Sequence, residues 1–196
     1  GEWKNMPDGA SYKEGTTATV SGTVPTREGY VFTGWNTAAN GSGTSYKAKD
    51  QITMNSNVTL YAQWTEKDKV TLRYVVDPAA GGSLTNAIES INPETGVPAG
   101  SAVTVNEGYE FAGWYCGTRL VSDQLVLTKE VIDQYAKNNN VYATTTFVAK
   151  LRKDINICEV DSPSDSTYDG VEHKWTPTVK DGDKALVEGT DYTVSY

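Results

Sequence analysis

EGYVFTGW, residues 28–35, decides the fold, because it returns as EGYEFAGW at residues 107–114. Six of the eight positions are identical, and they include an opening Glu-Gly pair and a closing Gly-Trp pair. A shared preference for hydrophobic residues would not bring both glycines back in register. We therefore interpret the two stretches as an internal repeat, which predicts two modules with the same strand order.

The similarity continues on both sides of this motif. Upstream, GTTATV at residues 15–20 resembles GSAVTV at 100–105; downstream, LYA at 60–62 resembles VYA at 141–143. The offset between matched residues changes from 85 to 79 to 81. We expect two loops of different length between strands of similar length, because insertions in β-modules fall in loops.

Each motif predicts a strand with a bulge close to its end. In a regular strand Phe32 and Trp35 would face opposite sides, because their spacing is odd. A glycine inside a strand often marks a bulge, which moves the next side chain to the other face. We therefore predict that Gly34 lets both aromatic rings share one core. The predicted core residues are Tyr30, Phe32, Gly34, Trp35 and Trp64 in the first module, and Tyr109, Phe111, Gly113 and Trp114 in the second.

The alternative is that these aromatic side chains form an exposed platform for a ligand. Burial is the commoner fate of Trp and Phe in small β-domains, so we expect a core.

The pattern GYxFxGW, followed by a Gly-Ser-Gly turn at 41–43 and NVTLYAQW at 57–64, resembles the internalin-type B repeat, also called the Listeria–Bacteroides repeat. The second module resembles a longer member of the same group of bacterial surface repeats. The resemblance implies small β-grasp-like folds in secreted, cell-wall-attached proteins, with no catalytic residues. Repeats of this family open with a strand of the type YTVTYDANGG. Residues 1–14 lack it, so either the first strand is missing or Trp3 and Met6 belong to a degenerate version.

The predicted organisation is mainly β (α+β). We expect a first module at residues 1–65, a second at 69–151 and a partial, β-sandwich-like module at 154–196. The last resembles the YDG/MBG-type module of bacterial adhesins through YDG at 168–170 and EGTDYTVSY at 188–196. One helix is expected at 128–139, where Thr128 can cap the start and apolar residues fall on one face. We expect the chain to be an excerpt of a longer protein.

Composition excludes several classes of partner. The chain of 196 residues carries a net charge of -8, and phosphate backbones and anionic membranes attract basic surfaces, so we expect no nucleic acid and no membrane surface. Its apolar runs are all shorter than the roughly 18 residues that span a bilayer, so we expect no membrane insertion. We expect a monomer whose partners are neighbouring repeats and a host protein or glycan.

The sequence contains no specific pattern for catalysis or metal binding. The single histidine, His173, has no nucleophile motif GxSxG to serve, and three His and Cys side chains are too few for a zinc site. Asp161, Asp165 and Asp169 could hold calcium, but they lack the spacing of an EF-hand and favour a loop. We expect no enzyme activity, no cofactor and no metal.

Cys116 and Cys158 are compatible with one disulfide that would join the second module to the third. Two free thiols are the alternative that we favour, because sequence gives no distance between them.

These observations predict a non-enzymatic extracellular segment of a bacterial cell-surface protein that acts as a stalk or adhesion module. The linkers between the predicted modules, TEKDK at 65–69 and RKD at 152–154, are short and polar, so we expect an extended chain. The alternative is a module that binds a glycan or host protein directly, through exposed tyrosines such as Tyr12, Tyr46 and Tyr115.

Overall fold

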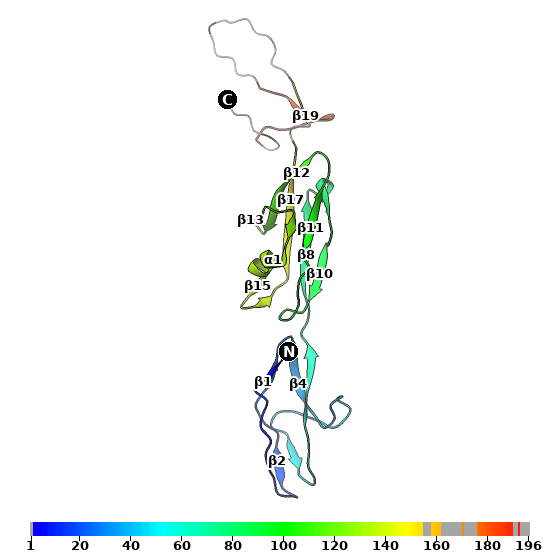
Figure 1. Ribbon diagram of the computed structural model, residues 1–196, viewed down its shortest axis with the longest axis vertical. Helices are drawn as coiled ribbons and strands as arrows, with labels where there is room; N and C mark the ends of the chain where they lie inside the picture. Colours follow the sequence, from blue (N-terminus) through cyan, green and yellow to red (C-terminus); the bar gives the residue numbers. More distant parts are fainter. Residues whose placement is uncertain (1, 155–157, 162–169, 171–175, 190–191, 193–196) are drawn as a thin grey trace. The chain divides into compact units, whose positions relative to one another are not determined.

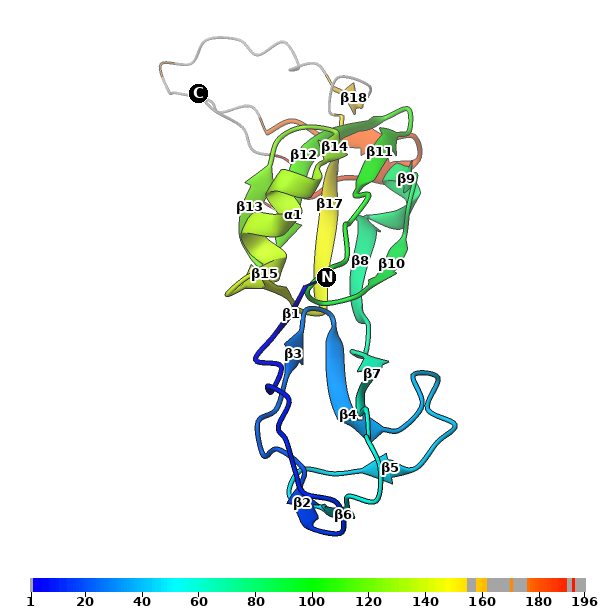
Figure 2. The same ribbon diagram turned by 60° about the horizontal axis from the view of Figure 1, so that its bottom comes forward.

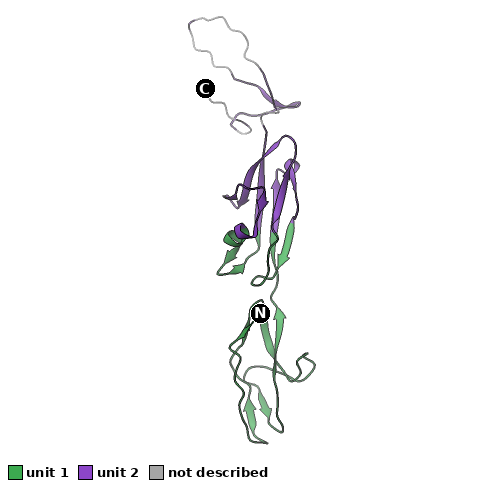
Figure 3. Ribbon diagram, in the orientation of Figure 1, with its two compact units in different colours: residues 1–72, 88–99, 132–145 green, residues 73–87, 100–131, 146–196 purple. Residues whose placement is uncertain are grey.

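The computed structural model describes residues 2–154, 158–161, 170, 176–189 and 192, and this part of the chain is mainly β, which confirms the predicted fold class (Figures 1 and 2). By proximity the residues divide into two compact units (Figure 3). Most of the segment assigned to the YDG/MBG-type module lies outside the described residues, and so do His173, Asp165 and Asp169.

Unit 1 comprises residues 1–72, 88–99 and 132–145. Strands β5, β4 and β7 lie side by side in that order; β2 pairs with β6, β1 with β3, and β15 with β16. The strands of this unit are β1 (Trp3–Lys4), β2 (Thr17–Thr19), β3 (Thr26–Arg27), β4 (Tyr30–Asn36), β5 (Ser45–Tyr46), β6 (Gln51–Thr53), β7 (Tyr61–Glu66), β10 (Ile88–Ile91), β15 (Lys137–Asn138) and β16 (Val141–Tyr142).

Unit 2 comprises residues 73–87, 100–131 and 146–196. Strands β8, β17, β12 and β13 lie side by side in that order, and β14, β11 and β9 form a second sheet. Three elements, β8 (Val70–Asp77), α1 (Lys129–Ala136) and β17 (Thr145–Lys153), have residues in both groups. The others are η1 (Ala79–Gly81), β9 (Gly82–Leu84), β11 (Ser101–Val105), β12 (Tyr109–Cys116), β13 (Arg119–Ser122), β14 (Val126–Leu127), β18 (Glu159–Val160), β19 (Val179–Asp181) and β20 (Lys184–Ala185).

Both motif strands carry the bulge that their glycine indicates. The register of β4 against β7 shifts between Phe32 and Gly34, and that of β12 against β17 shifts between Phe111 and Gly113. The two glycines have φ values of 142° and 125°, a region that residues with a side chain rarely adopt. The bulge brings Phe32 within 5.3 Å of Trp35, ring centroid to centroid, in an edge-to-face contact.

The closing strands show that one sequence match was wrong. Trp35 pairs with Ala62 in β7, and Trp114 pairs with Ala149 in β17, so β7 corresponds to residues 148–153. The VYA stretch at 141–143 instead begins with β16, a short strand that pairs with β15. The second module therefore inserts a helix and a small hairpin before its closing strand. LYA and VYA look alike because alternating apolar residues occur in both kinds of strand.

The predicted helix is present as α1 and is shorter than expected, because residues 137–138 already form β15. Ile132 and Ala136 are its buried residues, and both belong to the apolar face that the spacing indicated. In the first module, Trp3 and Lys4 pair with β3 and not with the closing strand β7. The N-terminal residues 2–14 therefore supply no strand at the edge of β7.

Candidate functional site

A junction around Gly29 joins the first module to a loop of the second, and all of its residues belong to unit 1. We call Gly29, Lys67, Asn92 and Glu94 the Gly29 junction. Gly29 lies in the turn between β3 and β4, Lys67 directly follows β7, and Asn92 and Glu94 lie in the loop after β10. The turn, the linker and the loop therefore meet at one glycine.

Both backbone groups of Gly29 have partners in this junction. Its N–H donates to Glu94 Oε2 at 2.6 Å, and its carbonyl accepts from Asn92 Nδ2 at 2.9 Å and from Lys67 N at 2.9 Å. Three of four junction residues thus bind the main chain of the fourth. Because these contacts are made to the backbone N–H and carbonyl of Gly29, they depend on the conformation of the turn and not on a side chain at this position.

Asn92 shapes its own loop as well as binding Gly29. Its Oδ1 accepts from the backbone N–H groups of Glu94 and Thr95, at 3.0 and 3.2 Å, and its own carbonyl accepts from Gly96 N. This is the local side-chain-to-backbone bonding that makes Asn a turn residue. Only 7% of the residue is exposed, so its amide is satisfied on both sides inside the junction.

Glu94 and Lys67 supply the charge of the junction. Lys67 Nζ forms an ion pair with Glu94 Oε1, and their side chains are 33% and 20% exposed, respectively. The hydrogen bond from Lys67, followed by that from the backbone of Gly29, lowers the pKa of Glu94 below its ordinary value. Both interactions favour the ionised carboxylate, so Glu94 binds the junction as an anion.

A side chain at position 29 would displace a side chain of the 92–96 loop. Its φ of 79° lies in the left-handed region, and a Cβ there would come within 2.9 Å of Thr95 Oγ1 and 3.2 Å of Asn92 Nδ2. The first of these approaches is too close for a real Cβ, so one group would have to move. The glycine of the repeated Glu-Gly pair is thus required by backbone conformation and by close approach of the loop.

The loop is held from its other side by β16. Tyr142 N donates to Pro93 O at 2.7 Å, and the Tyr142 hydroxyl donates to Asp133 Oδ1. Lys137 Nζ lies 3.4 Å from Asp133 Oδ2 and 4.3 Å from the centre of the Tyr142 ring. Burial, with the Asp133 hydrogen bond as the second cause, raises the pKa of Tyr142 well above its ordinary value. The hydroxyl therefore stays protonated and keeps donating.

The glycine of the second Glu-Gly pair, Gly108, accepts one of the hydrogen bonds that Gly29 accepts in the first module. Asp154 N donates to Gly108 O at 3.0 Å, as Lys67 N does to Gly29 O at 2.9 Å. The preceding residue, Lys153, forms an ion pair with Asp181 at 2.6 Å, and the hydrogen bond between them raises the pKa of Lys153. In each module the residue after the closing strand thus binds the glycine of the motif.

The structure places the predicted core residues at two levels of burial. Trp35 and Trp114 are 4% and 0% exposed, and Gly113 is also buried. The remaining members are half-buried: Tyr30, Phe32, Gly34, Trp64, Tyr109 and Phe111. Cys116 and Cys158 are free thiols, so no disulfide joins them.

Sequence reasoning missed Asn92 and Glu94. The stretch NPETG at 92–96 has the composition of a turn, and the structure shows a turn there. The Asn-Pro-Glu order signals an Asn-capped turn, but no local pattern says that its amide also binds a glycine 63 residues earlier.

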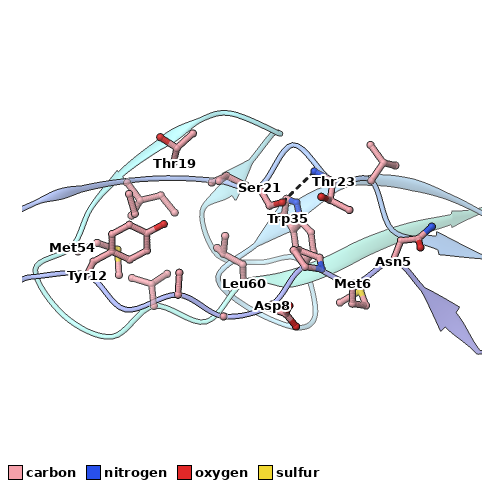
Figure 4. Close-up of a pocket in the computed structure, with 18 residues that line it drawn as sticks. Asn5, Met6, Asp8, Tyr12, Thr19, Ser21, Thr23, Trp35, Met54 and Leu60 are labelled. Carbon is pink, nitrogen blue, oxygen red and sulfur yellow. Dashed lines mark hydrogen bonds between the residues drawn. The ribbon is translucent and has the colours of Figure 1, made fainter.

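A pocket of about 780 Å³ lies within the first module, between the N-terminal segment and the core (Figure 4). Figure 4 shows Tyr12 and Met54 near one end of it and Trp35 and Met6 towards the other. Its lining is mixed, with apolar side chains such as Leu60 and Ile52. The indole Nε1 of Trp35 is buried and has no hydrogen-bond partner among the described residues.

Two kinds of site are absent from the described part of the chain. No three His, Cys, Asp or Glu side chains gather there in a way that could hold a metal ion. No helix in those same residues has the length and apolar character that crossing a membrane requires.

Comparison with known families identifies both modules. Residues 2–63 match the Listeria–Bacteroides repeat domain, and residues 72–150 match the divergent InlB B-repeat domain. Through these tandem modules the chain belongs to the internalin-type B-repeat family. The family matches end at residue 150, so the YDG/MBG-type assignment of residues 154–196 stays a prediction.

Curated relatives are much longer than this chain. A protein described as a Gly-rich membrane protein from Evansella cellulosilytica is 37% identical over 95 residues, which cover 45% of this chain and 10% of the relative. Internalin H from Listeria monocytogenes is 35% identical over 96 residues, covering 47% of this chain and 15% of its own. No solved structure gives a significant match. The chain thus contains repeat domains of the kind found in internalin-like bacterial surface and membrane proteins.

Proposed function

We propose that this chain is a non-enzymatic extracellular spacer, a stalk or adhesion segment of a cell-wall-anchored bacterial surface protein, in which successive repeats are fastened to one another. The observation that carries the proposal is the Gly29 junction. A spacer has to hold its successive repeats in defined positions. Hydrogen bonds between the turn of one repeat and the next restrict the movement between them.

The chemistry of the junction supports this role. Its contacts combine a buried amide, a backbone hydrogen bond of 2.6 Å to a carboxylate, and an ion pair. Hydrogen bonds to charged groups are worth about 1.5–3 kcal/mol each, more than neutral ones. Together they oppose bending between Gly29 and the 92–96 loop more strongly than a short polar linker could by itself.

Small-angle X-ray scattering on the monomeric chain tests the proposal. We expect a radius of gyration in the low to middle twenties of ångströms, against about 16 Å for a compact globule of this length. Gly29→Val should broaden the distribution of distances within the chain, whereas Gly15→Val should not. A wild-type value near 16 Å would contradict the spacer. A broad panel of glycosidase, esterase and peptidase substrates should give no turnover above background.

A second candidate function is direct binding of a glycan or host protein. The observation in its favour is Tyr12, which is 45% exposed and lines the pocket of the first module. Aromatic side chains with one apolar face and a polar tip are common at binding surfaces. A glycan array and a pull-down with the chain separate the two functions: binding that Tyr12→Ala removes supports the binder.

A further inference from the structure

We infer that the residue after the closing strand selects which repeat can follow. Lys67 accepts a repeat whose loop carries an acid at the position of Glu94, and Asp154, at the same place in the second module, excludes such a repeat. This inference rests on the proposed spacer function and deepens it, because it makes the order of the repeats depend on single residues. Its observations come from the Gly29 junction in unit 1 and from the equivalent place in unit 2.

Lys67 and Asp154 occupy equivalent places in their modules. Lys67 N donates to the carbonyl of Gly29 at 2.9 Å, and Asp154 N donates to the carbonyl of Gly108 at 3.0 Å. Each follows the last residue of its closing strand, which pairs with the tyrosine of the motif: Glu66 with Tyr30, and Lys153 with Tyr109. The backbone therefore positions residues 67 and 154 in the same way.

The side chains at this place carry opposite charges in the two modules. The first module has Glu66 followed by Lys67, and the second has Lys153 followed by Asp154. The same backbone thus presents a lysine after one closing strand and an aspartate after the other. Because the backbone is alike, charge is the property by which a following repeat can distinguish the two places.

The loop of the following repeat brings a carboxylate to this place. Glu94 Oε2 accepts from Gly29 N at 2.6 Å, and Glu94 Oε1 forms the ion pair with Lys67. Only 20% of the Glu94 side chain is exposed, so the carboxylate has lost much of its contact with water. A carboxylate in such surroundings needs a partner of opposite charge, and Lys67 supplies it.

Asn92 recognises the turn and does not distinguish charge. Its amide donates to the carbonyl of Gly29, and a motif glycine with the same backbone conformation offers the same acceptor. Gly108 has that conformation, with φ of 80° against 79° for Gly29. The amide would therefore fit both turns, and the difference between them lies with Glu94 and the residue that faces it.

At Gly108 the same loop would meet the wrong charge. A glutamate that accepted a hydrogen bond from Gly108 N would find Asp154 where the first junction has a lysine. Like charges that face each other across an interface are strongly unfavourable. The acid that the structure does place at this end of the second module is Asp181, and it forms an ion pair with Lys153 at 2.6 Å. The segment after the second module thus binds the lysine one residue before Asp154.

The first test changes Lys67 in the intact chain. Lys67→Asp gives the first junction the residue that the second module has at this place. Lys69→Asp is the matched control, because it makes the same change of charge at an exposed lysine of the same linker. The hydrogen exchange of the Gly29 amide should become about tenfold or more faster in Lys67→Asp, since Glu94 loses its counter-ion and leaves Gly29 N. In Lys69→Asp it should change by less than about twofold.

The second test moves the junction to Gly108. In one extended chain, residues 155–196 are replaced by residues 68–154, so that a copy of the second module follows Asp154. A matched chain also carries Asp154→Lys. The Gly108 amide of the first copy should exchange about tenfold or more slowly in the matched chain than in the other, because the introduced lysine pairs with the glutamate of the added loop. The Trp114 Nε1–H signals of both copies should be the same in the two chains and report that both copies are folded.

Unchanged exchange of Gly29 in Lys67→Asp would overturn the inference. Equal exchange of Gly108 in the two extended chains, with the Trp114 signals intact, would overturn it too. If an extended chain does not fold, the comparison of Lys67→Asp with Lys69→Asp decides. These results leave the spacer function standing, because the radius of gyration of the unmodified chain tests that function separately. A compact unmodified chain would instead remove the spacer and leave a selective junction.

Discussion

The two modules share one motif and one bulge, and yet their tryptophans lie in different surroundings. Trp114 is fully buried, its Nε1 donates to Leu125 O at 3.3 Å, and the β8 residue Tyr74 packs edge-on against it. Trp35 is 4% exposed, lines a pocket and has a buried Nε1 without a partner among the described residues. The difference teaches that the motif sets the geometry of its own strand, while the completeness of the core depends on strands that lie elsewhere in the chain.

Removing the two tryptophans should give the largest contrast. Trp114→Ala should destabilise the second module by about 4–5 kcal/mol, because a fully packed indole leaves a closed cavity. Trp35→Ala should cost the first module only about 2–3 kcal/mol, because its site is already open on one side. Denaturant-dependent hydrogen exchange measures both modules in one sample. Equal losses would show that the pocket has no effect on the packing of Trp35.

Gly29→Ala tests the junction, and Gly15→Ala is its control, because Gly15 has nearly the same φ but no atoms close to the position of a Cβ. Gly15 has φ of 78° and no atom within 4 Å of the position that a Cβ would take, whereas Gly29 has φ of 79° and close contacts with Thr95 and Asn92. Gly15→Ala should cost about 1 kcal/mol through backbone strain alone. Gly29→Ala should cost about 2–3 kcal/mol, because the side chain of Thr95 must also shift and the hydrogen bond from Asn92 is disturbed.

The two variants are compared by thermal unfolding, with hydrogen exchange of the Asn92 side-chain amide as a local readout. That amide should exchange faster with water only in Gly29→Ala. If both variants lose the same stability and neither changes Asn92, the close approach at Gly29 contributes nothing.

Glu94→Gln compares the junction with an exposed ion pair of the second module. The amide side chain keeps an acceptor for Gly29 N but loses the charge that binds Lys67, so we expect a loss of about 1 kcal/mol. Arg152 and Glu110 form an ion pair at 2.9 Å with side chains 70% and 41% exposed. Glu110→Gln should change the free energy of unfolding by about 0.5 kcal/mol or less. A larger loss in Glu110→Gln than in Glu94→Gln would reverse this ranking.

The smallest expected effect is on the pH dependence of the free energy of unfolding at acid pH. The pKa of Glu94 is lowered in the folded chain, first by the hydrogen bond from Lys67 and then by that from Gly29. Its contribution to stability is therefore present above the ordinary pKa of 4.5 and is lost as the pH falls through the lower folded value. Stability curves of wild type and Glu94→Gln should converge in that acid window and stay parallel above it. Curves that remain parallel throughout would contradict the ionised state of Glu94.

Much of the local structure could be predicted from the sequence. The Glu-Gly and Gly-Trp pairs indicated the repeat, and the odd spacing of Phe32 and Trp35 with a glycine between them indicated the bulge. These are properties of a few adjacent residues, where backbone sterics and alternation leave few alternatives. The spacing of Ile132 and Ala136 indicated the helix for the same reason.

The match of LYA at 60–62 to VYA at 141–143 was wrong, because alternation does not distinguish one short strand from another. Residues 141–143 and 148–150 both present apolar side chains at every second position, and only the pairing of Ala149 with Trp114 selects the second stretch. Register between strands is set by contacts across the sheet.

By itself, the sequence determined the family, the β class and the bulged Trp strands, because short-range sterics and periodicity act within a few residues. Only the tertiary structure decided that Asn92 and Glu94 bind Gly29 and that Tyr74 packs against Trp114. Hydrogen bonds and packing between residues more than sixty positions apart depend on where the chain returns in space. No local pattern encodes that return, since the same Asn-Pro-Glu turn would form with or without its partner.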